Sequence, residues 1–74
     1  METKKPAGPP VTVQLLGRNF LEVWDVDGHK HRVPLGNISD LLEHGGRVTI
    51  YVGNTTIRTA YTLDQLFAAM PANG

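Results

Sequence analysis

The chain lacks cysteine altogether, and it contains no long apolar run. Without cysteine it forms no disulfide, performs no thiol catalysis and binds no metal through thiolates. Small secreted proteins usually depend on disulfides, so we expect a reducing, cytoplasmic environment. No segment approaches the length of about 20 apolar residues that a membrane-spanning helix requires. The beginning of the chain also lacks the apolar segment of a secretory signal.

An excess of charge of either sign is absent as well, because seven basic residues balance seven acidic ones among 74 residues. Proteins that bind nucleic acid without sequence preference depend on an excess of lysine and arginine. The neutral balance therefore argues against a strong non-specific nucleic-acid binder, although a locally basic face remains compatible with it. The length allows one small domain with a thin core.

Proline content divides the chain into three parts. Residues 1–10 hold three prolines and two lysines without an apolar cluster, which predicts a disordered N-terminal arm. Residues 11–71 form the predicted single domain, and residues 72–74 form a loose tail. Within the domain, short alternating apolar runs separated by glycine turns predict an α+β fold that is mostly β. We expect an antiparallel sheet of four or five strands built from hairpins, with one C-terminal helix packed on it.

The first clear hairpin signal is Asp27-Gly28, a dipeptide typical of two-residue turns. Pairing across such a turn places Trp24 opposite His31 and Val23 opposite Arg32. Trp24, Val26 and Val33 then share the face that we expect to be buried. Farther along, residues 37–43 fit either a helical turn or a short irregular strand, and both alternatives stay open.

The C-terminal helix is predicted from a capping box, in which Thr62 and Gln65 each satisfy a backbone N–H of the other. Phe67 belongs to the apolar stripe of this helix, and we therefore expect that replacing it by alanine lowers the stability of the protein by on the order of 3 kcal/mol. The complete predicted core comprises Trp24, Val26, Val33, Val48, Ile50, Ile57, Leu63, Leu66 and Phe67.

Two histidines close to two aspartates resemble a metal cluster. His29 and His31 share one face of a strand, whereas the predicted register puts Asp25 on the opposite face and Asp27 in the turn. A third ligand is then missing, so we expect neither a metal nor another cofactor. No nucleophile lies in a recognisable catalytic motif, and we expect a protein that is not an enzyme.

The second hairpin offers a more informative surface. Pairing across Gly53-Asn54 puts two arginines, two threonines and a tyrosine on one face, with no carboxylate on those two strands. Arginine, hydroxyl and aromatic groups are the ones that contact phosphates and base edges. The candidate nucleic-acid-binding residues are Arg47, Thr49, Tyr51, Thr56 and Arg58, and Lys4 and Lys5 of the arm add positive charge.

The segment from Val33 to Pro71 resembles the first part of LytTR-type DNA-binding domains. The similar pieces are Val33-Pro34-Leu35, Ile38, the strand from Arg47 to Val52, Arg58, and Thr62-Leu63 through Leu66. LytTR domains continue with further strands, whereas this chain ends at Gly74 and adds a hairpin before the similar part. Where that family often has a DNA-contacting asparagine, this chain has Gly45-Gly46-Arg47. The order of strand, turn, strand and helix is also similar to the small FlbD family of flagellar regulators.

These resemblances imply a small bacterial transcription regulator, and they lead to two functional hypotheses. The first is a non-enzymatic binding module whose partner is duplex DNA. The second is a protein-interaction module that binds a protein partner or associates with itself through a sheet edge. Neither hypothesis requires a membrane or a small-molecule cofactor.

Overall fold

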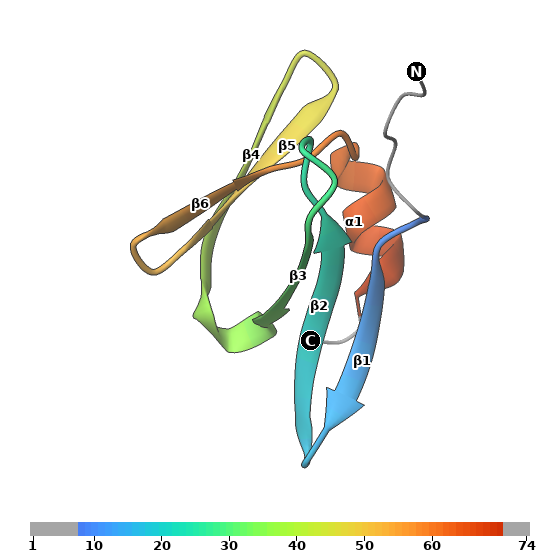
Figure 1. Cartoon of the computed structure of the whole chain (residues 1–74), viewed down its shortest axis with the longest axis vertical. Coiled ribbons are helices and arrows are strands. Elements are labelled where there is room, and N and C mark those ends of the chain that lie inside the picture. Colours follow the sequence, from blue (N-terminus) through green and yellow to red (C-terminus); the bar gives the residue numbers. More distant parts are fainter. Residues whose placement is uncertain (1–7, 71–74) are drawn as a thin grey trace.

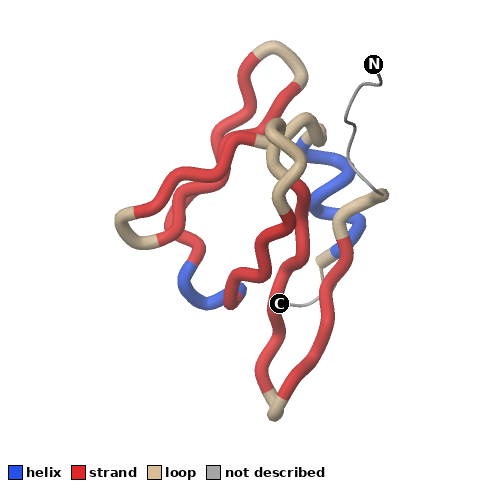
Figure 2. Tube along the Cα trace, in the orientation of Figure 1, coloured by secondary structure: helices blue, strands red, loops and turns tan. Residues whose placement is uncertain are grey.

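The computed structural model describes residues 8–70, and just over half of these described residues lie in β-strands (Figure 1, Figure 2). The predictions for residues 1–7 and 71–74, including those for Lys4 and Lys5, lie outside the described residues. The elements in chain order are β1 (Val11–Leu15), β2 (Arg18–Trp24), β3 (Lys30–Pro34), the short 3-10 helix η1 (Leu35–Asn37), β4 (Ile38–His44), β5 (Arg47–Val52), β6 (Thr55–Arg58) and α1 (Leu63–Ala69).

The strands form two antiparallel sheets of three strands, with the orders β1-β2-β3 and β4-β5-β6. The mostly β architecture with a C-terminal helix is therefore confirmed, while the single sheet of four or five strands is replaced by two smaller sheets. Each sheet is a meander, because every strand pairs with its neighbour in the sequence. The sequence pattern predicts such neighbour pairing, but the division between two sheets depends on where the chain bends at η1.

Residues 37–43, for which a helix and a strand were both open, are mostly strand. Asn37 ends η1, and β4 pairs antiparallel with β5, with a register shift between Ile38 and Asp40. Leu41 and Ile38 pack against the core from this strand. The choice of strand follows from the tertiary structure, since β5 offers a complete ladder of backbone partners.

The predicted register of the β2–β3 hairpin is wrong by one residue. Trp24 pairs with Lys30 and Val23 with His31. A hydrogen bond then joins Asp25 to His29, so the loop between them contains three residues, 26–28, instead of the predicted two. The N–H of Asp25 donates to the carbonyl of His29 at 2.8 Å, and the N–H of Gly28 donates to the carbonyl of Asp25 at 3.0 Å. Gly28 has a φ of 91°, as required at the bulge position of a three-residue hairpin loop.

A shift of one residue turns every side chain of a strand to the other face. The predicted burial of Trp24 and Val26 is consequently wrong: Trp24 is partly exposed, and Val26 is 48% exposed. Leu21 and Val23 are fully buried instead, on the same face as Val33. The core joins the inner faces of both sheets to the C-terminal segment, and its buried residues are Leu21, Val23, Val33, Val48, Ile50, Ile57, Tyr61 and Leu66.

The helix α1 begins as predicted. The Thr62 side chain accepts the N–H of Gln65 at 3.1 Å, and the Gln65 side chain accepts the N–H of Thr62 at 2.9 Å. The Glu43 carboxylate of β4 accepts a further N–H, that of Leu63, at 3.0 Å. Figure 1 shows α1 beside β1, which it contacts. In the part of the chain that the structure describes, there is no helix with the length and apolarity needed to cross a membrane.

The predicted burial of Phe67 is wrong, because this side chain is 57% exposed whereas its neighbour Leu66 is fully buried. Leu63 is only partly buried at the edge of the core. The helix has seven residues. It therefore turns a narrow stripe toward the sheets, and Phe67 lies beyond the edge of that stripe.

Tyr61 connects three separate parts of the chain. Its ring is buried in the core, and its hydroxyl accepts the backbone N–H of Trp24 at 3.0 Å and donates to the carbonyl of Gly8 at 3.1 Å. Pro10, two residues farther along, is buried as well. Residues 8–10 of the predicted arm therefore contact the folded domain.

Candidate nucleic-acid interface

The β5–β6 hairpin has the register that the sequence predicts. Tyr51 pairs with Thr56 and Thr49 with Arg58, across the two-residue turn at Gly53 and Asn54. Gly53 has a φ of 57°, a left-handed conformation that glycine adopts without strain. Because strand side chains alternate between faces, all five predicted contact residues lie on the outer face of the β4-β5-β6 sheet, opposite the core residues Val48, Ile50 and Ile57.

The five side chains differ in their exposure. Arg47, Thr56 and Arg58 are exposed, while Thr49 and Tyr51 in the middle of the sheet are half-buried. We call this surface the outer hairpin face. Its centre is rich in hydroxyl groups, and the two exposed arginines lie beside Thr49.

Strand β4 adds three residues to the outer hairpin face that sequence reasoning missed. Asp40 pairs with Tyr51, Leu42 with Thr49, and His44 with Arg47. Their spacing of two was the available signal, and it was not used because residues 37–43 were left open between helix and strand. The carboxylate of Asp40 therefore lies at one end of the face, while His44 and the arginines gather toward the other end.

Two basic residues of the β1-β2-β3 sheet are arranged differently. Glu22 accepts hydrogen bonds from Arg32, with an Nε–Oε2 distance of 2.7 Å, and pairs with Lys30 at 3.3 Å. The Lys30 ammonium also lies 5.6 Å from the centre of the Trp24 ring. By contrast, within residues 8–70 neither Arg47 nor Arg58 forms an ion pair with a carboxylate. Their charge is thus available to an external anion.

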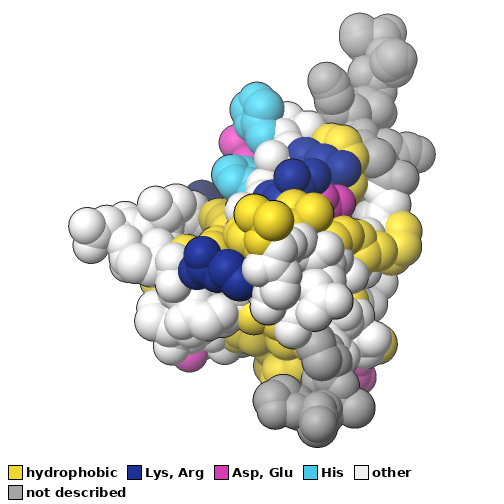
Figure 3. Space-filling view, turned by 90° about the horizontal axis from the view of Figure 1, so that it is seen from below, with side chains coloured by type: hydrophobic (Ala, Val, Ile, Leu, Met, Phe, Trp, Pro, Cys, Tyr) yellow, Lys and Arg dark blue, Asp and Glu magenta, His cyan; other side chains and the backbone are white. Residues whose placement is uncertain are grey.

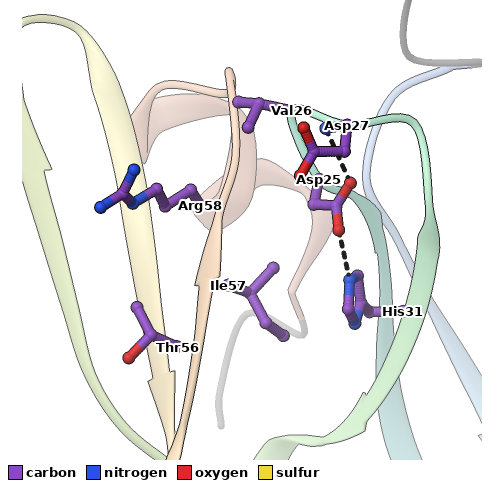
Figure 4. Close-up of a pocket in the computed structure, with 7 residues that line it drawn as sticks. All are labelled: Asp25, Val26, Asp27, His31, Thr56, Ile57 and Arg58. Carbon is purple, nitrogen blue, oxygen red and sulfur yellow. Dashed lines mark hydrogen bonds and ion pairs between the residues drawn. The ribbon is translucent and has the colours of Figure 1, made fainter.

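A groove of about 450 Å³ separates the β2–β3 hairpin from β6, with Asp25, Asp27 and His31 on one side and Thr56, Ile57 and Arg58 on the other. Figure 4 shows Thr56 and Arg58 directed to one side of β6 and Ile57 to the opposite side, toward His31. The two hairpins are joined here by a hydrogen bond of 2.9 Å from the N–H of Val26 to the carbonyl of Arg58.

The tip of the β2–β3 hairpin holds a dense polar cluster around Asp25. Oδ1 of Asp25 accepts the N–H groups of Asp27 and His29, both at 2.9 Å. Oδ2 lies 2.8 Å from Nε2 of His31, and because a carboxylate only accepts, this nitrogen carries the proton. The hydrogen bond from His31, together with the N–H groups of His29 and Asp27, lowers the pKa of Asp25 from 3.8 to about 2.

Acid is expected to weaken the fold through Asp25. Its pKa in the folded protein lies below the ordinary value, so its contribution to stability is complete above a pH of about 4 and is lost as the pH falls toward 2. Hydrogen bonding from Arg32 and Lys30 lowers the pKa of Glu22 in the same direction. We therefore expect the melting temperature to decrease more steeply between pH 4 and pH 2 in the wild type than in Asp25→Asn.

Thermal melts at closely spaced pH values, followed by circular dichroism, test this expectation. Asp64→Asn is the matched control, because Asp64 is exposed in the first turn of α1 and forms no ion pair among the described residues. Identical pH profiles for the wild type and Asp25→Asn would contradict the role assigned to the carboxylate.

Comparison with known proteins provides no further guide to this surface: no family model, curated protein or solved structure matches the chain.

Proposed function

We propose that the protein is a small non-enzymatic module that binds duplex DNA through the outer hairpin face, as a transcription regulator of the LytTR type would. The observation that supports this most is the register of the β5–β6 hairpin, which brings Arg47, Thr49, Tyr51, Thr56 and Arg58 to one face. The sequence resemblance over Val33 to Pro71 favours the same class of function.

The distribution of charge favours this face over the β1-β2-β3 sheet. Lys30 and Arg32 already neutralise Glu22, so a phosphate that approached them would compete with an ion pair. Arg47 and Arg58 have no such competitor among the described residues. An arginine makes forked, charge-assisted hydrogen bonds with phosphate oxygens, and the neighbouring threonine hydroxyls and tyrosine can add neutral ones.

The proposal includes the absence of catalysis, and the surroundings of the usual nucleophiles support it. The chain has no cysteine and a single serine, Ser39. The Ser39 hydroxyl donates to the backbone carbonyl of Tyr51 at 3.1 Å. A nucleophile requires a base that accepts its proton, and here the carbonyl occupies that position.

The test uses the variant Arg47→Gln/Arg58→Gln and mixed-sequence duplex DNA at two salt concentrations. Both arginines are exposed, so the double variant is expected to keep the fold with a change in stability within about 0.5 kcal/mol for each substitution. Each lost phosphate contact lowers the slope of log K against log salt by about 1, so the slope is expected to fall by about 2. With so few cations on the face, wild-type binding is weak at physiological salt.

Arg18→Gln is the matched control, because Arg18 is an exposed arginine on the other sheet. It is expected to bind DNA as the wild type does. Equal affinities and salt slopes for the wild type and the double variant would refute DNA binding by the outer hairpin face.

A protein-interaction module is the second candidate, and the exposed edge of β4 is the observation that favours it. Within residues 8–70, β4 pairs with β5 alone, and Leu42 on this strand is 51% exposed. An open strand edge can pair with a strand of a partner or of a second copy. Such an association relies on main-chain hydrogen bonds, so it would persist in Arg47→Gln/Arg58→Gln and at high salt. Sedimentation measurements at increasing protein concentration distinguish it from DNA binding.

A further inference from the structure

The tip of the β2–β3 hairpin brings together three side chains that are all metal ligands in other proteins. One ligand atom from each of Asp25, Asp27 and His29 lies within 4.8 Å of the others. The argument against a metal rested on a register that placed Asp25 on the opposite face from His29. The observed register reverses this, because Asp25 now shares the face of His29 and His31 and contacts both.

We propose that this hairpin tip binds one divalent transition-metal ion of the zinc type through Oδ2 of Asp25, the carboxylate of Asp27 and Nδ1 of His29. The site is separate from the outer hairpin face, so the two proposals stand or fall independently. His31 acts as a positioning residue, since its ring holds Oδ2 of Asp25 by the 2.8 Å hydrogen bond.

The distances suit such a site. Oδ2 of Asp25 and Nδ1 of His29 are 3.6 Å apart. Two ligands that each lie about 2.0–2.1 Å from a zinc ion, at tetrahedral or slightly wider angles, are separated by roughly 3.3–3.6 Å. These two groups therefore have nearly the separation of coordinating atoms. Asp27 is exposed, so its side chain can rotate to bring the carboxylate to the metal ion.

The first ligand is held in place before any metal arrives. Oδ1 of Asp25 is fixed by the N–H groups of Asp27 and His29, and Oδ2 is oriented by His31. Hydrogen bonds of this kind orient metal-binding carboxylates and raise their affinity. Because Oδ1 is occupied by the backbone, Oδ2, which lies 3.6 Å from Nδ1 of His29, is the oxygen left for a metal ion.

The cluster is also accessible from solvent. The side chain of His29 is 76% exposed, and the groove beside Asp25 has room for water molecules that complete the coordination. Figure 3 shows histidine side chains at the surface next to an acidic one. The nearest cation that lines the groove, Arg58, is directed away from Asp25 across β6 (Figure 4).

The donor set selects the class of metal. One imidazole with two carboxylates suits zinc, cobalt or manganese, whereas magnesium and calcium prefer sites built from oxygen alone. Two carboxylates and a divalent cation also leave the site neutral. We therefore expect zinc to bind with one ion per chain and magnesium to compete poorly.

Calorimetric titration of Zn²⁺ into the full chain, without an added histidine tag and at about pH 7.5, tests the proposal. We expect one saturable site whose affinity falls roughly tenfold or more in His29→Ala and in Asp27→Asn. Neither side chain is buried, and Asp25, which holds the turn together, is left unchanged. His44→Ala and Asp64→Asn are the matched controls, since both residues are exposed and lie outside the cluster, and they are expected to bind Zn²⁺ as the wild type does.

NMR spectra of the wild-type histidine rings provide a second measurement that does not depend on how the variants fold. Zn²⁺ is expected to shift the ring signals of His29 and leave those of His44 in place. The proposal is overturned if the wild type shows no saturable binding, if His29→Ala binds as tightly as the wild type, or if the signals of all the histidines shift alike.

Discussion

Leu66→Ala is expected to unfold a large share of the protein, whereas Phe67→Ala leaves it folded. Leu66 is the fully buried residue of α1 and packs in the core with residues of both sheets, so its truncation loses hydrophobic burial and leaves a cavity, at a cost of about 2–5 kcal/mol. Proteins have a stability of roughly 0.05–0.15 kcal/mol per residue, so the total free energy of unfolding of a 74-residue chain is comparable to this cost. The neighbouring Phe67 is 57% exposed, and its truncation leaves no enclosed cavity.

Urea unfolding of the two variants side by side measures this difference. Both substitutions are made in the same turn of the same helix and introduce the same residue, so helix propensity hardly distinguishes them. The packing of α1 seen in the structure would be incorrect if Phe67→Ala lost as much stability as Leu66→Ala. That result would instead support the sequence-based expectation that the Phe67 ring covers the sheet.

Tyr61→Phe is expected to destabilise the protein by about 1–3 kcal/mol through the loss of one hydroxyl group. The ring keeps its place in the core, but the backbone N–H of Trp24 loses its acceptor and the carbonyl of Gly8 loses its donor. Both bonds connect parts of the chain that are far apart in sequence. Most of the lost stability comes from the partly buried N–H of Trp24, which no longer has a hydrogen-bond acceptor.

Tyr51→Phe is the matched control, because it removes the same atom from a half-buried ring on the outer hairpin face. We expect its melting temperature to stay within a few degrees of the wild type. Hydrogen exchange provides the finer measurement: the amide of Trp24 should lose protection in Tyr61→Phe and keep it in Tyr51→Phe. Equal protection in the two variants would contradict the role given to the Tyr61 hydroxyl.

The sequence predicts the β5–β6 hairpin well because the information is local. A two-residue turn at Gly53 and Asn54 and the alternation of Val48, Ile50 and Val52 are sufficient to determine the pairing. The capping box at Thr62 is local in the same way, since both of its hydrogen bonds close within one helical turn. The placement of the five predicted contact residues on one face follows from this register, while their role in DNA binding stays a proposal.

The β2–β3 hairpin shows why a turn signal alone is insufficient. Asp27-Gly28 is compatible with a two-residue loop, but the Asp25 carboxylate accepts two backbone N–H groups and stabilises a loop of three residues. This side-chain contribution outweighs the dipeptide preference, and the strand then turns Leu21 and Val23 inward. The closeness of Asp25 to His29 and His31 at the tip was missed for the same reason. An aspartate two residues before Asp-Gly was the signal available in the sequence.

The arrangement of the two sheets could not be read from the sequence, because it depends on contacts between distant residues. An isolated bridge pairs Asp25 with Thr59, and the buried Thr59 hydroxyl donates to the carbonyl of Val48 at 2.7 Å. Neither interaction has a pattern in the neighbouring sequence. The burial of Leu66 in preference to Phe67 has the same origin, since it depends on how α1 lies against the sheets.

The pairing of every strand with its neighbour in the sequence also determines how the chain reaches its folded state. Contacts between residues close in sequence require little loop closure, and proteins dominated by such contacts fold rapidly. We therefore expect each meander to form early, and the two to meet later through the shared core and through the hydrogen bonds from Val26 to Arg58 and from Trp24 to Tyr61. We expect unfolding to begin where the two meanders meet, so the lifetime of the native state depends on the interactions that form last.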